Sequence, residues 1–336
     1  MGRKRLLYRK NALHSGYDDR SLRRMCDKGN LDRIRPGVYA MPVGTESTGR
    51  AMRHVVAIQA SVAKQQVPAI VSHISAAALH GLPLQDIPLD RVHMTRHGAG
   101  GGHTSTRRHL HMAPVSADDI TEIGGVPVTS VARTVIDIAR TTDFTRGVAM
   151  VDAALNNAMT TRKELMHVLR GLADKFGSRR ATAAVEFADH RSESVGESAS
   201  RIIMAREGLP TAELQRVIRD GGVLLGRVDF YLAKYGVVGE FDGKLKYVGD
   251  DEQEDNDDAA CPPGEVAWAE KQREDALRNR GLEVVRWTWP DLHVHGRISD
   301  LFASAIRRSS SRPEPCIDMR RPQDDYVPRR KLRPRL

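Results

Sequence analysis

VLLGRVDFYLAKYGVVGEFDGKLKY, residues 223–247, decides the fold of the second half of this chain. Two runs rich in β-branched and aromatic residues flank a turn near Lys234–Gly236, a pattern that predicts two antiparallel strands. In a strand, side chains two residues apart lie on the same face. The charged residues after the turn are therefore expected to project together from one side of the sheet.

Those charged residues are two carboxylates and a lysine. Glu240, Asp242 and Lys244 alternate along the second strand, while Phe241 is expected to pack on the opposite face. Asp229 lies in the first strand, and hairpin pairing would bring its carboxylate beside theirs. The sequence thus predicts a group of acids with one lysine at the end of a strand pair.

Two interpretations of this strand remain open on spacing alone. A charged edge strand is a common solvated feature and needs no function. A group of like charges, however, costs energy unless a cation compensates it. Mg²⁺ takes oxygen ligands and lowers the pKa of a bound water that can attack a phosphodiester, and a nearby lysine can stabilise the developing charge.

Two further segments continue the pattern, GESASRIIMAREGLP at residues 196–210 and EKQREDALRNRGLEVVRWTWPDL at residues 270–292. The order from Ser192 is helix, three strands, helix, strand. Together these segments resemble the PD-(D/E)XK nuclease superfamily, in particular its very-short-patch-repair-like branch. The resemblance covers about Ser192 to Ala305. It implies a restriction-endonuclease-like α/β domain.

The resemblance also implies a catalytic site that uses Mg²⁺ or Mn²⁺. Asp229, Glu240 and Asp242 would hold the metal. Many members of the branch carry histidine where this chain has Lys244 and Lys246, so the implied chemistry departs from theirs at that point. The residues implied to be catalytic are Glu197, Asp229, Glu240, Asp242 and Lys244, and those implied to contact DNA beside them are Lys271 and Arg273.

The first forty residues predict two short helices followed by a hairpin. In DDRSLRRMCDKG, residues 18–29, either aspartate can cap a helix that Gly29 ends. In LDRIRPGVYAMP, residues 31–42, the pair Pro36–Gly37 predicts a hairpin turn. Basic side chains on both elements favour a winged helix-turn-helix on DNA, although a solvated basic helix remains the alternative. The predicted nucleic-acid contacts are Arg20, Arg23, Arg24, Lys28, Arg33 and Arg35.

The middle of the chain predicts mixed α and β structure. VSHISAAALHGLP, residues 71–83, reads as a strand end and a helix, with His80 buried at the helix end. GVPVTSVARTVIDIAR, residues 125–140, reads as a strand, a cap at Thr129 or Ser130, and a second helix. The glycine-rich stretch between them is expected to form a flexible hairpin tip. No acid or cysteine supports its histidines at a ligand spacing, so they predict no metal site; they are His93, His97, His103, His109 and His111.

These N-terminal and middle segments resemble the AbiEi-type antitoxins of type IV toxin-antitoxin systems. The resemblance rests on residues 31–42, 71–83 and 125–140. It implies a winged-helix DNA-binding head that often represses its own gene, and a following domain that opposes a nucleotidyltransferase toxin.

Composition supports a polyanionic partner. The chain carries 52 Lys and Arg against 43 Asp and Glu, a net charge of +9, with basic residues concentrated at both ends. Seven acids and no base occupy residues 250–258, which are expected to form a disordered charged loop, the alternative being a DNA mimic. Three scattered cysteines are typical of reduced thiols in the cytoplasm. Neither a membrane span nor a secretory leader is expected.

The predicted fold class is α/β multidomain. A winged helix-turn-helix at residues 1–48 is followed by an AbiEi-like α+β domain with a helical connector at 49–190, the nuclease-like domain at 191–306 and a basic, disordered tail at 307–336. The predicted protein is cytoplasmic, associates with the nucleoid and double-stranded DNA, and is a candidate homodimer. A cognate toxin is a candidate protein partner.

Three hypotheses about function follow. The first is a DNA-binding endonuclease that depends on Mg²⁺ and acts in phage defence or toxin-antitoxin biology. The second is an antitoxin-like repressor that keeps a degenerate nuclease fold. The third is a protein that sequesters a toxin without touching DNA, which predicts no salt-dependent affinity for DNA.

Overall fold

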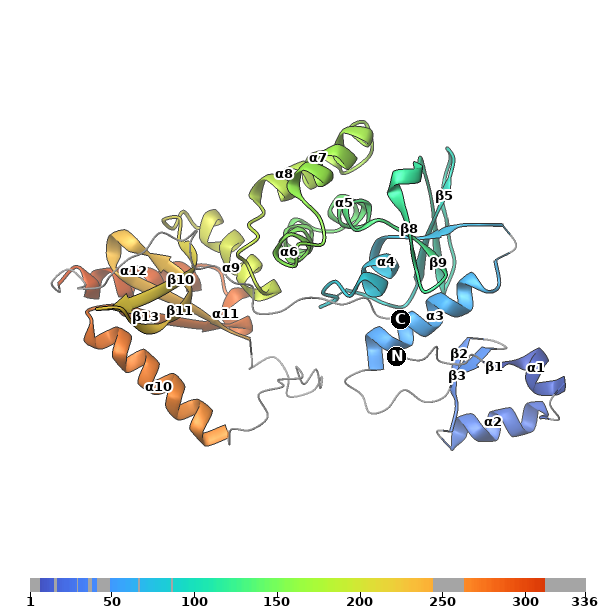
Figure 1. Ribbon diagram of the computed structural model, residues 1–336, viewed down its shortest axis with the longest axis horizontal. Coiled ribbons are helices and arrows are strands. Elements are labelled where there is room, and N and C mark those ends of the chain that lie inside the picture. The colour runs from blue at the N-terminus through green and yellow to red at the C-terminus, as the bar shows by residue number, and fades with distance from the viewer. Residues whose placement is uncertain are drawn as a thin grey trace. The chain divides into compact units, whose positions relative to one another are not determined.

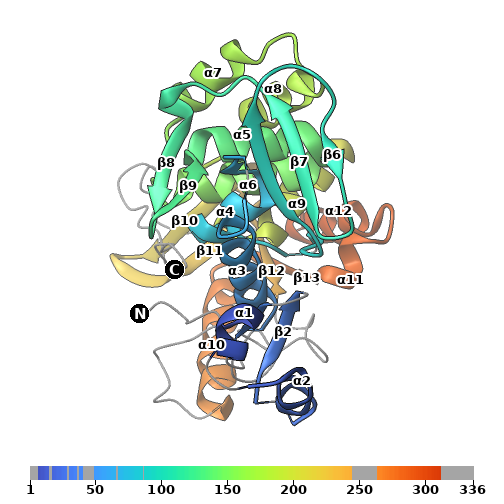
Figure 2. The same cartoon turned by 90° about the vertical axis from the view of Figure 1, so that its right-hand side faces the viewer.

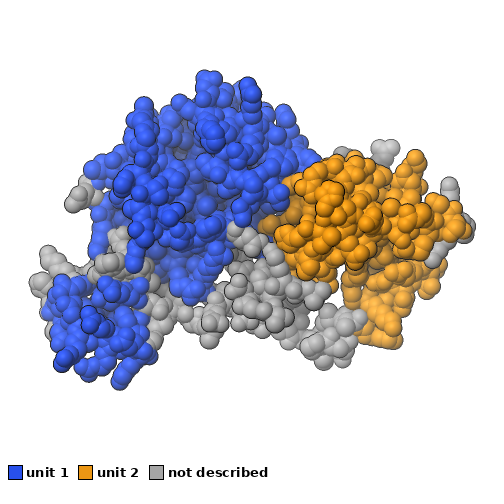
Figure 3. Space-filling model, turned by 180° about the vertical axis from the view of Figure 1, so that it is seen from behind, with its two compact units in different colours: residues 1–187, 331–336 blue, residues 188–330 orange. Residues whose placement is uncertain are grey.

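The structure is a computed structural model of the 336-residue chain. It describes residues 7–14, 17–28, 30–35, 38–40, 49–65, 67–85, 87–243 and 263–311. The chain divides into two compact units (Figure 3). Unit 1 comprises Met1–Phe187 with Lys331–Leu336, and unit 2 comprises Ala188–Arg330. Each unit combines helices with sheet, so the predicted mixed α/β character is confirmed.

The N-terminal part of unit 1 contains the predicted helices and hairpin. Strand β3 lies between β1 and β2 in a small sheet, antiparallel to both. Helix α2 begins after Asp18, whose carboxylate accepts the Ser21 N–H at 2.6 Å, so the predicted cap is confirmed. The elements are β1 (Leu7–Tyr8), α1 (Arg9–His14), α2 (Asp19–Asp27), β2 (Asp32–Arg35) and β3 (Val38–Ala40), and their core is Ala12, Leu22, Leu31 and Tyr39.

The larger part of unit 1 is built on a six-stranded sheet in the order β6-β7-β5-β4-β9-β8. Helices α3 and α4 precede and follow its first strand, and His80 is buried at the end of α4, as predicted. The elements are α3 (Gly49–Val62), β4 (Ile70–Val71), α4 (His73–His80), β5 (Val92–His97), β6 (His103–Thr104), β7 (Arg108–Ala113), a 3₁₀ turn η1 (Ala117–Asp119), β8 (Ile120–Ile123) and β9 (Val126–Thr129).

The prediction of a simple hairpin at the glycine-rich stretch is wrong. Strands β5 and β7 pair in parallel, with His93 opposite His109. The antiparallel partner of β7 is β6, a short strand that the sequence pattern did not predict. The glycines of residues 98–102 therefore connect β5 to β6, because a parallel neighbour cannot be reached through a tight turn.

A layer of helices covers one face of this sheet (Figures 1 and 2). Helix α5 begins after Ser130, whose hydroxyl accepts the Arg133 N–H at 3.3 Å, which confirms one of the two predicted caps. Small residues allow α6 to pack closely on α5, since a Cβ at Gly147 would lie 3.3 Å from Ala139 Cα. The helices are α5 (Val131–Thr141), α6 (Phe144–Asn156), α7 (Arg162–Gly171) and α8 (Ser178–Phe187).

Unit 2 has a four-stranded sheet in the order β10-β11-β12-β13. The predicted pair β11 and β12 is antiparallel, whereas β12 and β13 are parallel and α10 lies between them in the chain. One core cluster joins the sheet to α9 and α12, and a second joins the sheet to α10. The elements are α9 (Val195–Arg206), β10 (Glu213–Asp220), β11 (Val223–Leu232), a 3₁₀ turn η2 (Ala233–Tyr235), β12 (Val237–Asp242), α10 (Pro263–Asn279), β13 (Glu283–Thr288), α11 (Trp289–Leu292) and α12 (Arg297–Ser309).

Two glycines allow close packing on this sheet. A Cβ at Gly196, in the first turn of α9, would lie 1.9 Å from the ring of Phe241. A Cβ at Gly239 would lie 2.8 Å from the ring of Trp287. Because real Cβ atoms do not approach other atoms so closely, both positions require glycine in this packing. The first turn of α9 is thereby held against β12.

Candidate functional site

Three buried carboxylates gather in unit 2. Glu197 comes from the first turn of α9, Asp229 from β11 and Glu240 from β12, and their exposed fractions are 8%, 9% and 8%. Buried acids are rare unless they are paired with a cation or hydrogen-bonded. We call these three residues, together with Gln215, the carboxylate cluster.

Gln215 links two of the acids. Its Nε2 donates to Glu197 Oε2 at 3.0 Å and to Asp229 Oδ1 at 3.2 Å. The other oxygen of Asp229, Oδ2, accepts the N–H of Phe241 at 3.0 Å. Gln215 lies on β10 with a φ of +52°, a strained value for a residue other than glycine. Sequence reasoning missed this residue, because one glutamine in a strand indicates no chemistry until its neighbours are known.

Glu197 also has a structural role in capping α9. Its Oε1 accepts the hydroxyl of Ser194 at 2.7 Å, and its Oε2 accepts the N–H of Glu193 at 2.9 Å. Ser194 in turn accepts the N–H of Glu197 at 3.1 Å. This reciprocal arrangement is close to a capping box. Glu197 therefore has several hydrogen-bond donors around it, and its burial alone does not demand a metal.

Glu240 is paired with a basic residue of α10. Arg273 Nη2 donates to Glu240 Oε1 at 3.1 Å and to Glu270 Oε1 at 2.8 Å, while its Nη1 donates to the Arg227 carbonyl at 2.9 Å. Arg273 was predicted to contact DNA beside the site. It lies beside the site with its guanidinium engaged by protein acceptors, whereas Lys271 on the same helix is exposed.

Burial shifts the acid–base behaviour of the cluster. Burial, with the charge of Asp229 second, raises the pKa of Glu197 to about 8 and the pKa of Glu240 to about 7. Arg273 opposes the shift of Glu240 without cancelling it. Near neutral pH the carboxyl groups of Glu197 and Glu240 are therefore partly protonated, and the negative charge of the cluster is reduced. A bound cation could displace these protons.

We expect Glu240→Gln to stabilise unit 2 at pH 8 and to leave its stability nearly unchanged at pH 5. A carboxyl whose pKa is raised on folding stabilises the fold below its unfolded pKa, and this contribution is lost as pH rises from about 4.5 to about 7. The amide can still accept from Arg273 but cannot ionise. The gain at pH 8 should be on the order of 1–2 kcal/mol in the free energy of unfolding, measured by denaturant titration.

The matched control is Asp220→Asn, which removes a carboxylate that pairs with Arg280 at the edge of the same sheet. Its effect should not grow between pH 5 and pH 8. A stability difference for Glu240→Gln that is equal at both pH values would contradict the raised pKa.

The other two predicted residues of this site, Asp242 and Lys244, are not part of the buried cluster that the structure describes. Asp242 is half-buried at the end of β12, and Lys244 lies outside the described residues, as does the acidic stretch 250–258. Within the described parts of the chain, no three acids bring their oxygens within 4.8 Å of one another. The ligand set of Asp229, Glu240 and Asp242 therefore stays a prediction. Two carboxylates and waters are sufficient for Mg²⁺, and the oxygen donors of Asp229 and Glu240 fit that ion.

A second candidate site is the basic surface near the N-terminus. The predicted residues of α2 and its C-cap are exposed, and Arg33 on β2 is exposed as well. The side chain of Arg35 lies outside what the structure describes. A cavity of about 660 Å³ in unit 1 is lined in part by Arg33, Arg50, Arg53 and Arg107. The exposed residues of α2 and its C-cap are Arg20, Arg23, Arg24 and Lys28.

Two protein-family models match segments of unit 1. Residues 4–42 match the family described as transcriptional regulator, AbiEi antitoxin, and residues 69–187 match the AbiEi antitoxin C-terminal domain. The segments that resemble the two antitoxin domains therefore lie in unit 1, in that order. The second match ends at residue 187, where unit 1 gives way to unit 2.

Individual relatives come from Mycobacterium tuberculosis. Two curated sequences, uncharacterized protein MT2308 of strain CDC 1551 / Oshkosh and uncharacterized protein Rv2248 of strain ATCC 25618 / H37Rv, are each 38% identical over 111 residues. The match covers 32% of this chain and 40% of each relative. The crystal structure of the RV2827C protein aligns with a TM-score of 0.36 and 15% identity, over 54% of this chain and 71% of that one.

Among the helices that the structure describes, none is both long and apolar enough to cross a bilayer.

Proposed function

We propose that this chain is a DNA-binding transcriptional regulator of the AbiEi antitoxin type. The observation that carries the proposal is the pair of antitoxin domain matches, at residues 4–42 and 69–187, with exposed basic residues on the first of them. A helix of this kind can enter the major groove while the following hairpin contacts the backbone, as in a winged helix-turn-helix. The family matches also support a cognate toxin protein as a partner.

The charges of this head suit duplex DNA. Arg20, Arg23 and Arg24 are exposed at i, i+3 and i+4 spacing, which places them on one face of α2, and Arg33 adds a positive charge on the hairpin. Arg33 also lines the same cavity as Arg50 and Arg53 of α3, so that basic side chains from two elements face one hollow. We further propose a homodimer on an inverted repeat, in the cytoplasm at the nucleoid, since dimeric readers match the symmetry of such operators.

We expect the double variant Arg23→Ala/Arg24→Ala to lose affinity for DNA upstream of its own gene by about 10- to 10³-fold at moderate salt. Each arginine that neutralises a phosphate releases condensed counterions. The slope of log affinity against log salt should therefore fall by about 2 in magnitude if both residues contact phosphates. Fluorescence anisotropy with a labelled duplex over a salt series measures both quantities.

The matched control is Lys163→Ala/Arg170→Ala, which removes two exposed positive charges from α7. It should change the affinity less than 3-fold, because general electrostatic attraction is shared by the whole chain. Equal losses in the two double variants would reject a specific interface on α2. No measurable affinity of the wild type for any upstream duplex would reject the regulator itself.

The carboxylate cluster favours a second candidate function, a metal-dependent DNA endonuclease in unit 2. Asp229 and Glu240 would hold Mg²⁺ or Mn²⁺, which when bound supplies a water of lowered pKa for attack on a phosphodiester. Arg273 positions Glu240 through its hydrogen bond at 3.1 Å. Gln215, on the neighbouring strand β10, positions Asp229 by donating a hydrogen bond to its Oδ1. Cleavage of supercoiled plasmid by the full-length chain, with and without Mn²⁺, tests this candidate.

A further inference from the structure

Three histidines of unit 1 converge on one face of the six-stranded sheet. His93 lies on β5, while His109 and His111 lie on β7. The parallel register sets His93 opposite His109 and Thr95 opposite His111, so alternation places all three rings on the same face. One ring nitrogen from each lies within 4.8 Å of those of the other two. We call these three residues the histidine cluster.

We propose that the histidine cluster binds one divalent transition-metal ion, with Zn²⁺ as the preferred ion. Imidazole nitrogen is a favoured ligand of Zn²⁺, Cu²⁺ and Ni²⁺, whereas the hard ion Mg²⁺ takes oxygen. Three protein nitrogens leave a fourth tetrahedral position for water or another ligand. His93 Nδ1 and His111 Nε2 are already 3.0 Å apart, close to the separation of two nitrogens on one tetrahedral ion.

Burial disfavours a positive charge on the three rings. Burial lowers the pKa of His93 to about 4 and that of His111 to about 3, and it lowers the pKa of His109 as well. The nearby charges are Arg91, which disfavours a further positive charge, and Asp90, which favours it. Neutral imidazoles can bind a metal near pH 7 without first losing a proton.

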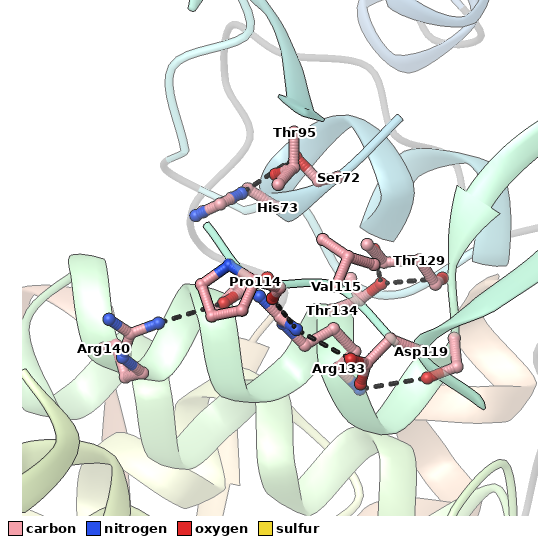
Figure 4. Close-up of polar contacts among 12 residues, drawn as sticks. Ser72, His73, Thr95, Pro114, Val115, Asp119, Thr129, Arg133, Thr134 and Arg140 are labelled. Atoms are coloured by element: carbon pink, nitrogen blue, oxygen red, sulfur yellow. Dashed lines mark hydrogen bonds and ion pairs between the residues drawn. The ribbon is translucent and has the colours of Figure 1, made fainter. Parts of the chain in front are cut away.

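A fourth histidine orients the cluster from the start of α4. The ring of His73 stacks on that of His111 with centroids 3.7 Å apart. Its Nδ1 hydrogen-bonds the hydroxyl of Ser72 at 3.0 Å, and Thr95 donates to the same hydroxyl at 2.7 Å (Figure 4). His73 has a φ of +51°, an uncommon value for a residue other than glycine. Because its ring stacks on that of His111, we assign His73 as a positioning residue.

The test uses the full-length chain without a histidine tag. Co²⁺ replaces Zn²⁺ as a spectroscopic probe, because four-coordinate Co²⁺ with nitrogen ligands absorbs visible light far more strongly than Co²⁺ in water or on carboxylates. We expect one equivalent of Co²⁺ to produce these bands and Zn²⁺ to abolish them. His109→Asn, which changes the most exposed of the three rings, should weaken Zn²⁺ binding at least about 10-fold in a chelator competition.

Two kinds of control separate this site from other sites. His97→Asn and His103→Asn remove histidines of the same region that lie outside the cluster, and they should leave the affinity unchanged. Asp229→Ala alters the carboxylate cluster of unit 2 and should also leave the bands unchanged, so loss of the proposed nuclease would not affect this result. Circular dichroism confirms that each variant is folded.

Three results would overturn the proposal. The first is the absence of intense bands at one equivalent of Co²⁺ in the folded wild type. The second is an equal affinity in wild type and His109→Asn. The third is a loss in His97→Asn or His103→Asn as large as that in His109→Asn.

Discussion

Replacing Arg133 with methionine is expected to lower the free energy of unfolding of unit 1 by about 3–5 kcal/mol. Arg133 is only 1% exposed, and its Nε donates to Asp137 Oδ2 at 2.9 Å. Its Nη1 donates to Asp119 Oδ2 at 2.9 Å and to the Pro114 carbonyl at 3.0 Å (Figure 4). Methionine preserves the aliphatic volume and removes every one of these contacts.

The loss is large because Asp137 would remain buried with less compensation. Asp137 is 1% exposed, and after the change its remaining basic partner is Arg140 at 3.2 Å. Burial raises the pKa of Asp137 even in the wild type, against the effect of Arg133. A raised pKa removes stability as pH rises above that of the unfolded carboxyl, so the defect should be larger at pH 8 than at pH 5.

Chemical denaturation at the two pH values measures this effect. Arg146→Met is the matched control, since it removes an arginine from an exposed pair with Asp143 and should cost less than about 0.5 kcal/mol. A loss below about 1 kcal/mol for Arg133→Met at pH 8 would show that the buried pairs contribute little.

Replacing Asp229 with alanine is expected to reduce Mn²⁺-dependent plasmid cleavage at least about 10³-fold, if unit 2 is an endonuclease as proposed. A bound metal contributes several kcal/mol of transition-state stabilisation, and every 1.36 kcal/mol is a factor of ten in rate. Asp229 is central to the cluster: it accepts from Gln215 and from the Phe241 N–H, and its charge acts on both glutamates.

The control for this variant is Asp220→Ala, which removes an acid at the edge of the same sheet and should retain full activity. Circular dichroism must show that both variants are folded, because alanine removes the acceptor of the Phe241 N–H and one of the two acceptors of Gln215. Equal cleavage by Asp229→Ala and the wild type would show that the carboxylate cluster is not the site of the activity. No cleavage by the wild type over varied substrates and both metals would reject the endonuclease, and the DNA-binding regulator would stand independently.

Alternation along a strand was sufficient to predict part of the carboxylate cluster. It predicted that Glu240 and Phe241 project from opposite faces of β12. Hairpin pairing then predicted that Asp229 lies next to that strand. The same rule could not predict Gln215, whose backbone departs from the strand conformation. Nor could it predict that Arg273 would bind Glu240, since the two residues are 33 positions apart, one on a helix and the other on a strand.

The histidine cluster shows a different limit of spacing arguments. Its histidines come from two strands paired in parallel, and nothing in the interval between His93 and His109 distinguishes parallel from antiparallel pairing. Metal-ligand signatures read from sequence rely on residues close together in one element or turn. Side chains that are brought together by the register of two strands escape such signatures.

The close contact of Gly196 with Phe241 has a consequence for comparing this chain with its relatives. The glycine precedes Glu197, and a Cβ at that position would collide with the ring of Phe241, so any larger residue there requires the ring or the first turn of α9 to move. A relative could keep all three acids and still fail to assemble them. We therefore expect relatives that assemble the cluster as this chain does to carry glycine at this position together with the three acids.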